Sequence, residues 1–573
     1  MREVLSGNEA IAQAVYDAGV HLVSSYPGTP STEITEHLAK FDGFHAEWAT
    51  NEKVALEVVL GASLAGARAF TAMKHVGLNV ASDPLMTASY TGVTGGLVIV
   101  VADDPNMHSS QNEQDSRHYA RFSKLPMFEP ASSEDAYIYA KAAFDISETY
   151  SCPVFVRSTT RVSHSMSVVG YTGRIERALI DYKKEPERWV MTPVNARARH
   201  KVVEERLKTL ERVAGDYVSV HGEGSVGIIT SGVVFQYVKE ALPEVKILKL
   251  GMVWPLPVKE IEAFATTVEK LYVVEELDTI IETELRVKGI HLEPLTRSIC
   301  GELSVEAVAK LFDKEIKTAE ALKEPIPLRP PNMCPGCSHR GIFHAISRLR
   351  LNVCGDIGCY TLGYMAPLAA MDSCICMGAS VSMAHGFDRA RGGEYANKSV
   401  AVIGDSTFLH TGINGLVNTV YNGGFSTVVI LDNRITGMTG HQPNAATGFN
   451  IRGEKAPAVD FVLLCRAIGV EHVRVVDPFD IDACMDALRE ETTRREPSVI
   501  ITNRPCIFAD KSVIKPPFKV NTDTCSGCRA CLRIGCPAIS WNSEKRRAFI
   551  DDEQCTGCGL CSKLCRFDAI IGG

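Results

Sequence analysis

Short apolar runs alternate with amphipathic segments along most of the chain. The runs at residues 20–24, 97–102, 399–403 and 427–431 have the length and composition of buried strands. Segments with helical spacing lie between such runs, as at residues 412–421. Strands that alternate with helices are typical of parallel sheets. The pattern therefore predicts a multidomain α/β protein.

Breaks in the pattern divide the chain into segments. Proline-rich stretches at 325–331 and 514–520 are expected to be linkers. The predicted segments are a parallel-sheet domain at 1–165, a charged helical connector at 166–222, a further α/β domain at 223–322, a second parallel-sheet domain at 332–513 and a small cysteine-rich domain at 516–573.

Composition narrows the functional classes. The chain has 573 residues, 45% hydrophobic and 22% charged, with a net charge of −8. This balance lacks the basic excess of nucleic-acid-binding proteins. The first residues lack the basic segment and apolar core of a signal peptide, and the apolar runs are far shorter than the ~18 residues that span a membrane. We expect a soluble, cytoplasmic protein that binds neither nucleic acid nor membrane.

Cysteine spacing provides the strongest chemical signal. Eight of the 19 cysteines form two similar segments about 30 residues apart, each with three cysteines at C-x2-C-x2-C spacing and a fourth further on. This arrangement is typical of two-cluster ferredoxins, in which the fourth cysteine of each half ligates the cluster of the other half. We therefore assign two [4Fe–4S] clusters, the first to Cys525, Cys528, Cys531 and Cys565 and the second to Cys555, Cys558, Cys561 and Cys536.

Two features qualify this assignment. Zinc is the alternative metal, but zinc sites favour paired C-x2–4-C knuckles over three cysteines at x2 spacing. Four residues separate Cys531 from Cys536, where three are usual, and Arg566 follows Cys565 in place of proline. The longer spacing affects the position of Cys536.

Polar residues end two neighbouring predicted strands. Gly404-Asp405-Ser406 follows the strand at 399–403, and Asn433 follows the strand at 427–431. In parallel sheets, ligands bind at the carboxyl ends of the strands, and carboxylate and amide oxygens suit Mg2+. An unremarkable α/β turn is the alternative interpretation of this pattern alone.

The same segment resembles the thiamine diphosphate signature, a Gly-Asp pair followed 25–30 residues later by an asparagine. The resemblance implies that Asp405, Asn433 and the carbonyl of Ile435 bind Mg2+. Met377 and Gly378 resemble the loop that contacts the aminopyrimidine, and Thr439 lies in a segment rich in small residues that would let the backbone approach a cofactor. Ser406 and Asp432 depart from the usual Gly and Asn without removing a ligand.

Residues 1–165 resemble the pyrimidine domain of 2-oxoacid:ferredoxin oxidoreductases. In that family a glutamate at a helix start hydrogen-bonds N1′ of the aminopyrimidine, and the resemblance assigns Glu52 to this role. Glu47 and Glu57 are nearby rivals, and a first-turn helix acid is the structural alternative. Thr29 matches the substrate-side threonine of the family. His75 is a further candidate at the site, although a lone histidine is more often structural.

A third cysteine set lies outside the C-terminal domain. In the related oxidoreductases a C-P-G-C segment, a later G-C and a P-C bind a cluster near thiamine, and these match Cys334, Cys337, Cys359 and Cys506. The resemblance implies a third [4Fe–4S] cluster. Buried free thiols beside a tight turn are the alternative.

Domain order and motifs together resemble the large subunits of indolepyruvate:ferredoxin oxidoreductases over essentially the whole chain. The resemblance rests on segments such as C-P-G-C-S-H-R at 334–340 and the cysteine-rich tail. It implies that arylpyruvates, CoA and oxidised ferredoxin give aryl-acetyl-CoA, CO2 and reduced ferredoxin. Exposed iron–sulfur clusters also predict an oxygen-sensitive protein. It also implies a small β subunit as partner, in an (αβ)2 heterotetramer. The alternatives are another 2-oxoacid, such as pyruvate, 2-oxoglutarate or a branched-chain acid, and an electron-transfer subunit with an inert thiamine fold.

Overall fold

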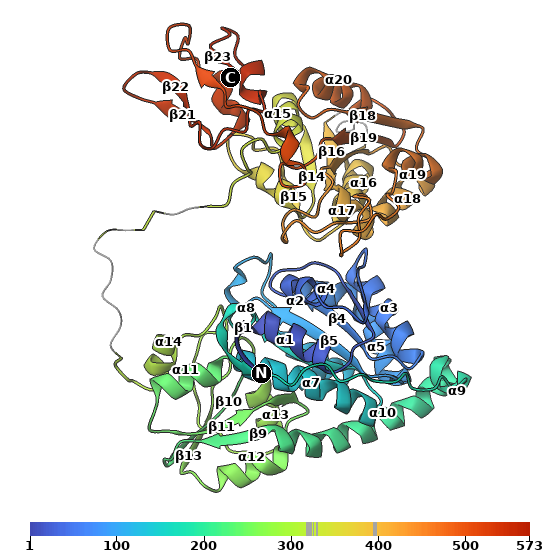
Figure 1. Cartoon of the computed structure of the whole chain (residues 1–573), viewed down its shortest axis with the longest axis vertical. Helices are drawn as coiled ribbons and strands as arrows, with labels where there is room; N and C mark the ends of the chain where they lie inside the picture. Colours follow the sequence, from blue (N-terminus) through green and yellow to red (C-terminus); the bar gives the residue numbers. More distant parts are fainter. Residues whose placement is uncertain (317–323, 325, 328–329, 393–397, 573) are drawn as a thin grey trace. The chain divides into compact units, whose positions relative to one another are not determined.

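The chain forms two compact units, Met1–Lys323 and Glu324–Gly573, drawn in Figure 1. The computed structural model describes residues 1–316, 324, 326–327, 330–392 and 398–572. Positions 325, 328 and 329 of the expected linker at 325–331 lie outside the described residues. We call the two parts the N-terminal unit and the C-terminal unit and describe each by itself.

A seven-stranded sheet forms the centre of the N-terminal unit, in the order β12-β6-β7-β5-β4-β2-β3. Neighbouring strands are parallel except for β12, which is antiparallel to β6. Every residue of β5 is buried, which its continuous apolar run predicts. The strands are β2 (Leu22–Ser25), β3 (His45–Trp48), β4 (Ala69–Lys74), β5 (Leu97–Asp103), β6 (Met127–Phe128), β7 (Val154–Thr159) and β12 (Met252–Trp254).

Helices connect these strands. Ser31 precedes α2 and is of a residue type that often caps helices, but its hydroxyl donates to the Gly28 carbonyl at 2.8 Å and does not cap the helix. A two-stranded ribbon pairs β1 (Arg2–Ser6) with β8 (Met166–Gly170). The helices are α1 (Gly7–Asp17), α2 (Thr32–Leu38), α3 (Glu52–Leu64), α4 (His75–Val80), α5 (Ser82–Thr91), α6 (Arg117–Ser123), α7 (Ser133–Tyr150) and α8 (Thr160–His164).

A second, four-stranded sheet follows the long helix α10 (Pro193–Ala214) in the same unit, in the order β13-β10-β11-β9. Strand β9 lies within the expected connector at 166–222 and pairs antiparallel with β11, so this sheet begins before residue 223. Strand β12 leaves the segment to join the first sheet. The elements are β9 (Val218–His221), β10 (Val226–Ser231), α11 (Val234–Ala241), β11 (Lys246–Leu250), α12 (Val258–Ala265), β13 (Lys270–Val273), α13 (Ile280–Val287) and α14 (Val305–Leu311).

The C-terminal unit is built on a six-stranded, fully parallel sheet in the order β15-β14-β16-β17-β19-β18. The order reverses direction along the chain, so the loops that follow β14, β16 and β17 emerge beside one another at the carboxyl edge. The strands are β14 (Asn352–Gly355), β15 (Ser373–Cys374), β16 (Ser399–Gly404), β17 (Thr427–Asp432), β18 (His472–Val476) and β19 (Ser498–Asn503).

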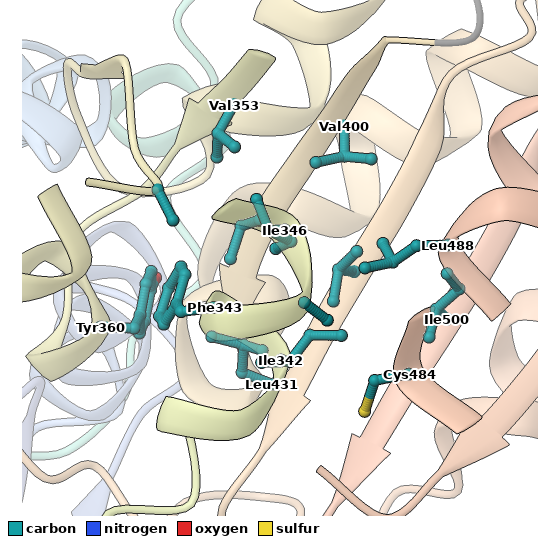
Figure 2. Close-up of a cluster of buried hydrophobic side chains, with 14 of the residues drawn as sticks. Ile342, Phe343, Ile346, Val353, Tyr360, Val400, Leu431, Cys484, Leu488 and Ile500 are labelled. Carbon is teal, nitrogen blue, oxygen red and sulfur yellow. The ribbon is translucent and has the colours of Figure 1, made fainter. Parts of the chain in front are cut away.

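Two apolar clusters pack helices on this sheet. In the first, α15 (Arg340–Leu349) and α20 (Ile481–Thr492) pack on the strands. Figure 2 shows side chains of α15, such as Phe343 and Ile346, among those of the strands and α20. The second cluster joins the sheet to α16 (Ala379–Arg391), α18 (Ile413–Tyr421) and α19 (Phe461–Ile468). The packing of the first cluster fixes the position of α15, which begins three residues after Cys337 of the C-P-G-C segment.

The cysteine-rich domain forms two small antiparallel ribbons, β20 (Lys519–Val520) with β23 (Ile570–Ile571) and β21 (Ile539–Asn542) with β22 (Arg547–Ile550). Residues 514–520 are therefore only partly a linker, because β20 belongs to the domain. Its Ile534 and Leu560 pack with Phe479 and Ile481 next to the parallel sheet. The Lys563 ammonium also donates to the Phe479 carbonyl at 2.8 Å. The domain is thus docked on the parallel-sheet domain within one unit.

Candidate functional site

Asp405 and Asn433 lie at the carboxyl ends of adjacent strands, as the sequence predicts. Strands β16 and β17 pair in parallel, with Gly404 opposite Leu431. Both side chains are buried, at 2% and 8% exposure. Asp405 Oδ1 accepts from the Ser406 amide at 2.6 Å, whereas its Oδ2 makes no hydrogen bond to any part of the chain that the structure describes. An unpartnered buried carboxylate oxygen is costly in the apo fold.

The electrostatics of this loop fit a divalent cation. Burial raises the pKa of the Asp405 carboxyl to about 7, and the nearby Asp432 carboxyl adds to the rise. The amide groups of Ser406, Arg434 and Ile435 oppose it. A cation would relieve both the repulsion and the unpartnered oxygen. The donor set of carboxylate and amide oxygens therefore fits Mg2+, which prefers oxygen ligands.

Asp356, which the sequence analysis missed, organises the loop at Met377 and Gly378. Its side chain accepts from the amides of Ile357 and Gly378 at 2.9 Å and of Ser380 at 3.0 Å. The Met377 carbonyl accepts from the Thr411 hydroxyl at 2.6 Å. A Cβ on Gly378 would lie 2.1 Å from that hydroxyl oxygen, so only glycine fits there. Asp356 follows β14, and the strand-end rule that identified Asp405 could have found it.

The segment that follows Asn433 forms a turn held by hydrogen bonds between its own residues. Thr439 donates its hydroxyl to Gln442 Oε1 at 2.6 Å, and Gln442 donates to the Thr439 carbonyl at 3.0 Å. Thr436 donates to the Ser406 hydroxyl at 3.1 Å, which ties this turn to the Asp405 loop. The predicted cofactor-binding residues Ser406 and Thr439 therefore belong to one connected set of loops.

The structure brings the third cysteine set together beside these loops. Burial raises the pKa of Cys337 to about 12, and the thiols of Cys334 and Cys506 add to the rise. Burial likewise raises the pKa of Cys359 to about 11, again with contributions from Cys506 and Cys334. Thiols affect one another in this way only when they are close. The Cys506 amide also donates to the Asn433 carbonyl at 2.9 Å, which links the set to the metal loop.

The eight C-terminal cysteines separate into the two predicted groups. Burial raises the pKa of Cys531 to about 11, with contributions from Cys528, Cys565 and Cys525. Burial raises the pKa of Cys561 to about 12, chiefly with Cys558, Cys536 and Cys555. The extra residue before Cys536 is taken up by a short 3-10 helix (Ala530–Ile534) and by Gly535 at φ 68°. Each group is a set of four thiols, which suits a cubane cluster.

In the N-terminal unit, burial distinguishes Glu52 from its rivals. Glu52 begins α3, capped by the Asn51 side chain, and is 5% exposed. A Cβ added to Gly77 of α4 would lie 2.5 Å from Glu52 Oε1, so the carboxyl group lies against that helix. Glu47 instead accepts from the Ser24 hydroxyl at 2.9 Å, and the exposed Glu57 pairs with Lys53. The geometry favours Glu52 as the buried acid.

The other predicted residues of the N-terminal unit follow strands of the seven-stranded sheet. Thr29 is half-buried after β2, and His75 is fully buried at the start of α4, where burial lowers its pKa. Lys74, which sequence reasoning missed, ends β4 and donates to the Ser109 carbonyl at 2.7 Å. Burial lowers the pKa of Lys74 to about 8. The sequence could have pointed to Lys74, because it is a lysine at the end of a wholly buried strand.

Family models match four parts of the chain. A model described as "Pyruvate flavodoxin/ferredoxin oxidoreductase, thiamine diP-bdg" matches residues 13–210, and one described as "Indolepyruvate oxidoreductase domain" matches 234–322. The C-terminal thiamine pyrophosphate-binding domain of thiamine pyrophosphate enzymes matches 356–502, and a 4Fe-4S binding domain matches 548–571.

Relatives that match nearly the whole chain agree with these family models. The indolepyruvate oxidoreductase subunit IorA of Pyrococcus abyssi is 40% identical over 99% of this chain and 96% of its own length. The IorA protein of Archaeoglobus fulgidus is 40% identical over 99% and 97%. The chain belongs to the IorA family of indolepyruvate oxidoreductase subunits. A solved 2-oxoglutarate:ferredoxin oxidoreductase from Magnetococcus marinus is 21% identical over 55% of this chain and 65% of its own, with a TM-score of 0.46.

Family membership confirms three expectations: the family itself, the α/β fold with thiamine-binding domains and a ferredoxin-like tail, and the assignment to an oxidoreductase. Thiamine diphosphate and a 4Fe–4S binding domain are likewise supported by the matched models. The chain is thus a subunit of a thiamine-diphosphate-dependent 2-oxoacid:ferredoxin oxidoreductase with iron–sulfur centres. Every helix among the described residues is too short or too polar to cross a membrane.

Proposed function

We propose that this subunit catalyses the oxidative decarboxylation of arylpyruvates such as indolepyruvate and phenylpyruvate, with CoA as acyl acceptor. The products are an aryl-acetyl-CoA, CO2 and electrons that pass through [4Fe–4S] clusters to ferredoxin. One observation carries the proposal: the Cys506 amide donates to the carbonyl of Asn433, so a four-thiol set adjoins the metal loop of a thiamine-type fold. Decarboxylation and one-electron transfer are thus brought to the same part of the chain.

The residues of the chain have defined roles in this proposal. Asp405, Asn433 and the Ile435 carbonyl would hold Mg2+. Asp356 accepts from the amides of Gly378 and Ser380 and so fixes the loop at Met377 and Gly378, which would contact the cofactor. When bound, thiamine diphosphate supplies the carbon nucleophile and the electron sink for decarboxylation. Glu52, buried at the start of α3, would hold the aminopyrimidine ring nitrogen. Thr29 and His75 would face the substrate.

Three cysteine sets would carry the electrons. Cys525, Cys528, Cys531 and Cys565 would hold one cluster, Cys555, Cys558, Cys561 and Cys536 a second, and Cys334, Cys337, Cys359 and Cys506 a third. The mutual effects of the thiols within each set support this grouping. Anaerobically purified protein should therefore contain about twelve iron atoms per chain. A content of about eight would remove the third cluster.

The named relatives support the proposed partner and substrate. Proteins named as subunits of indolepyruvate oxidoreductase match nearly the whole chain, and we propose that a small β subunit completes an (αβ)2 heterotetramer. Oxidised ferredoxin would be the acceptor. The named relatives also support indolepyruvate over 2-oxoglutarate, because a 2-oxoglutarate synthase subunit KorA of Archaeoglobus fulgidus is only 27% identical over 52% of this chain.

The test is ferredoxin reduction by the anaerobically co-purified subunits. Indolepyruvate, phenylpyruvate, pyruvate, 2-oxoglutarate and a branched-chain 2-oxoacid are compared, each with CoA and with or without thiamine diphosphate and Mg2+. We expect thiamine-dependent reduction that is fastest with arylpyruvates and is abolished by Asp405→Ala. Asp486→Ala, which removes an exposed carboxylate of the same unit, is the matched control. Reduction by none of the acids in iron-replete protein would favour an electron-transfer subunit without catalytic thiamine chemistry.

A further inference from the structure

Arg340 is a buried cation that joins two of the cysteine sets. It is 1% exposed, at the first position of α15, three residues after Cys337. Its Nε donates to the Cys334 carbonyl at 3.1 Å, and its Nη2 donates to the Met333 carbonyl. Its Nη1 donates to the carbonyls of Ile534 and Gly535 at 3.2 and 2.6 Å. One guanidinium therefore holds the loop of Cys334 and the loop that leads into Cys536.

Among the described residues, no carboxylate pairs with this guanidinium. Its four hydrogen-bond partners are all main-chain carbonyls, and no carboxylate lies within ion-pair distance of it in the part of the chain that the structure describes. The other two arginines among the largest fully buried side chains differ, because Arg117 and Arg157 pair with two or more carboxylates each. A buried charge without a counter-ion is strongly unfavourable.

The cysteine sets near Arg340 could supply the missing negative charge once they hold clusters. A cavity lined by Cys536, Cys555, Cys558 and Cys561 is also lined by Gly336 and Arg340. The same guanidinium donates to the carbonyl of Cys334, a member of the third set. A [4Fe–4S] cluster with four thiolates is an anion, and nearby charge and hydrogen bonding set its reduction potential. Two clusters would therefore supply the negative charge that the protein does not.

We propose that Arg340 is a positioning residue that locks the Cys334 and Cys536 loops together and raises the reduction potentials of the two clusters that adjoin it. A positive charge stabilises the more negative, reduced form of each cluster. The inference rests on the clusters of the proposed function. We call the ferredoxin cluster of Cys525, Cys528, Cys531 and Cys565 the outer cluster. None of the four hydrogen bonds of Arg340 goes to these cysteines, so the outer cluster serves as an internal reference.

The test is an EPR-monitored redox titration of the anaerobically reconstituted full-length chain. Electrons come from dithionite and mediators, so the result depends on neither thiamine nor a 2-oxoacid, and failure of the proposed reaction would not affect it. Arg340→Gln removes the charge, and Arg340→Lys retains it while losing the planar fork. Arg348→Gln, at an exposed arginine of the same helix α15, is the matched control.

We expect Arg340→Gln to shift the adjoining clusters to more negative potentials, by about tenfold or more in the reduction equilibrium, or about 59 mV. The outer cluster should not shift. Arg340→Lys should retain most of the potential, and Arg348→Gln should match the wild type. Unchanged potentials in iron-replete Arg340→Gln would overturn the proposal. Equal shifts in Arg340→Gln and Arg340→Lys would also overturn it, because charge would then not be the cause. If Arg340→Gln loses iron, the titration of Arg340→Lys decides, and a wild-type-like potential supports the proposal.

Discussion

Nε2 of His339 lies 3.3 Å from Nδ2 of Asn433, although 94 residues separate them. An amide nitrogen can only donate, so the imidazole accepts this bond. Burial lowers the pKa of His339 to about 4, with a smaller effect of Arg340, which keeps the ring neutral and able to accept near pH 7. His339 therefore fixes the orientation of the Asn433 side-chain amide. Its nitrogen points to His339, so its oxygen remains available to a metal ion.

Replacing His339 should weaken metal binding without removing a ligand. We expect His339→Leu to lower Mn2+ affinity in the presence of thiamine diphosphate by about 10- to 100-fold, the usual effect of losing an outer-shell partner. His339→Gln should recover part of the loss, because its carbonyl oxygen can accept from Asn433. Free Mn2+ measured by EPR reports the affinity directly. His385→Leu, at a half-buried histidine of α16, should bind as the wild type does, and equal affinity for His339→Leu would show that Asn433 needs no such support.

Cys536 should ligate the same cluster as Cys555, despite its unusual spacing. The structure places it with Cys555, Cys558 and Cys561. We therefore expect Cys536→Ala and Cys555→Ala to lose the same EPR signal, and Cys565→Ala to lose the other ferredoxin signal. Cys300→Ala, at an exposed cysteine outside the sets, should retain all signals. Retention of both ferredoxin signals in Cys536→Ala would exclude this cysteine as a ligand.

The fold and the cysteine sets were accessible from sequence because their signals are local. The apolar runs at 399–403 and 427–431 become β16 and β17, and the glycine–aspartate pair falls at a strand end as predicted. The two C-x2-C-x2-C segments identify themselves by spacing alone. Family resemblance then supplied Glu52, which the structure shows to be the buried acid of the three candidates.

What the sequence did not show depends on contacts between distant residues. His339 and Arg340 belong to the C-P-G-C-S-H-R segment, but this local pattern does not show their partners, which lie 94 and 195 residues away. Strand β12 joins the first sheet from the middle segment, and β20 pairs with the last strand of the chain. Ser31 has the expected type for a helix cap, but a competing bond to Gly28 uses its hydroxyl.

Gly336 should be required for the close approach of the C-P-G-C turn to the ferredoxin domain. Its φ is +68°, and a Cβ would lie 2.2 Å from the Thr556 hydroxyl oxygen. We expect Gly336→Ala to lower iron retention during anaerobic gel filtration, and Thr556→Ala to restore part of it in the double variant. Gly453→Ala is a matched control, since Gly453 has φ +77° with nothing within 4 Å. It isolates the backbone cost of a left-handed alanine, roughly 1–2 kcal/mol. Equal iron retention in the two glycine variants would mean that the contact with Thr556 does not matter.

Glu276 should make the N-terminal unit less stable as the pH rises. Its carboxyl accepts from the Leu303 amide at 2.7 Å, and burial raises its pKa to about 7. The folded state therefore binds this proton more tightly than the unfolded chain does. The resulting stability is complete below about pH 4.5 and is lost as the pH rises through 7.

Glu276→Gln keeps an oxygen acceptor for Leu303 and removes the charge. We expect its urea midpoint to match the wild type near pH 4.5 and to exceed it at pH 8, with an upper limit of about 3 kcal/mol. Glu262→Gln, at an exposed position, should show no such trend. A constant difference between Glu276→Gln and the wild type from pH 4.5 to 8 would show that the Glu276 proton is not linked to folding.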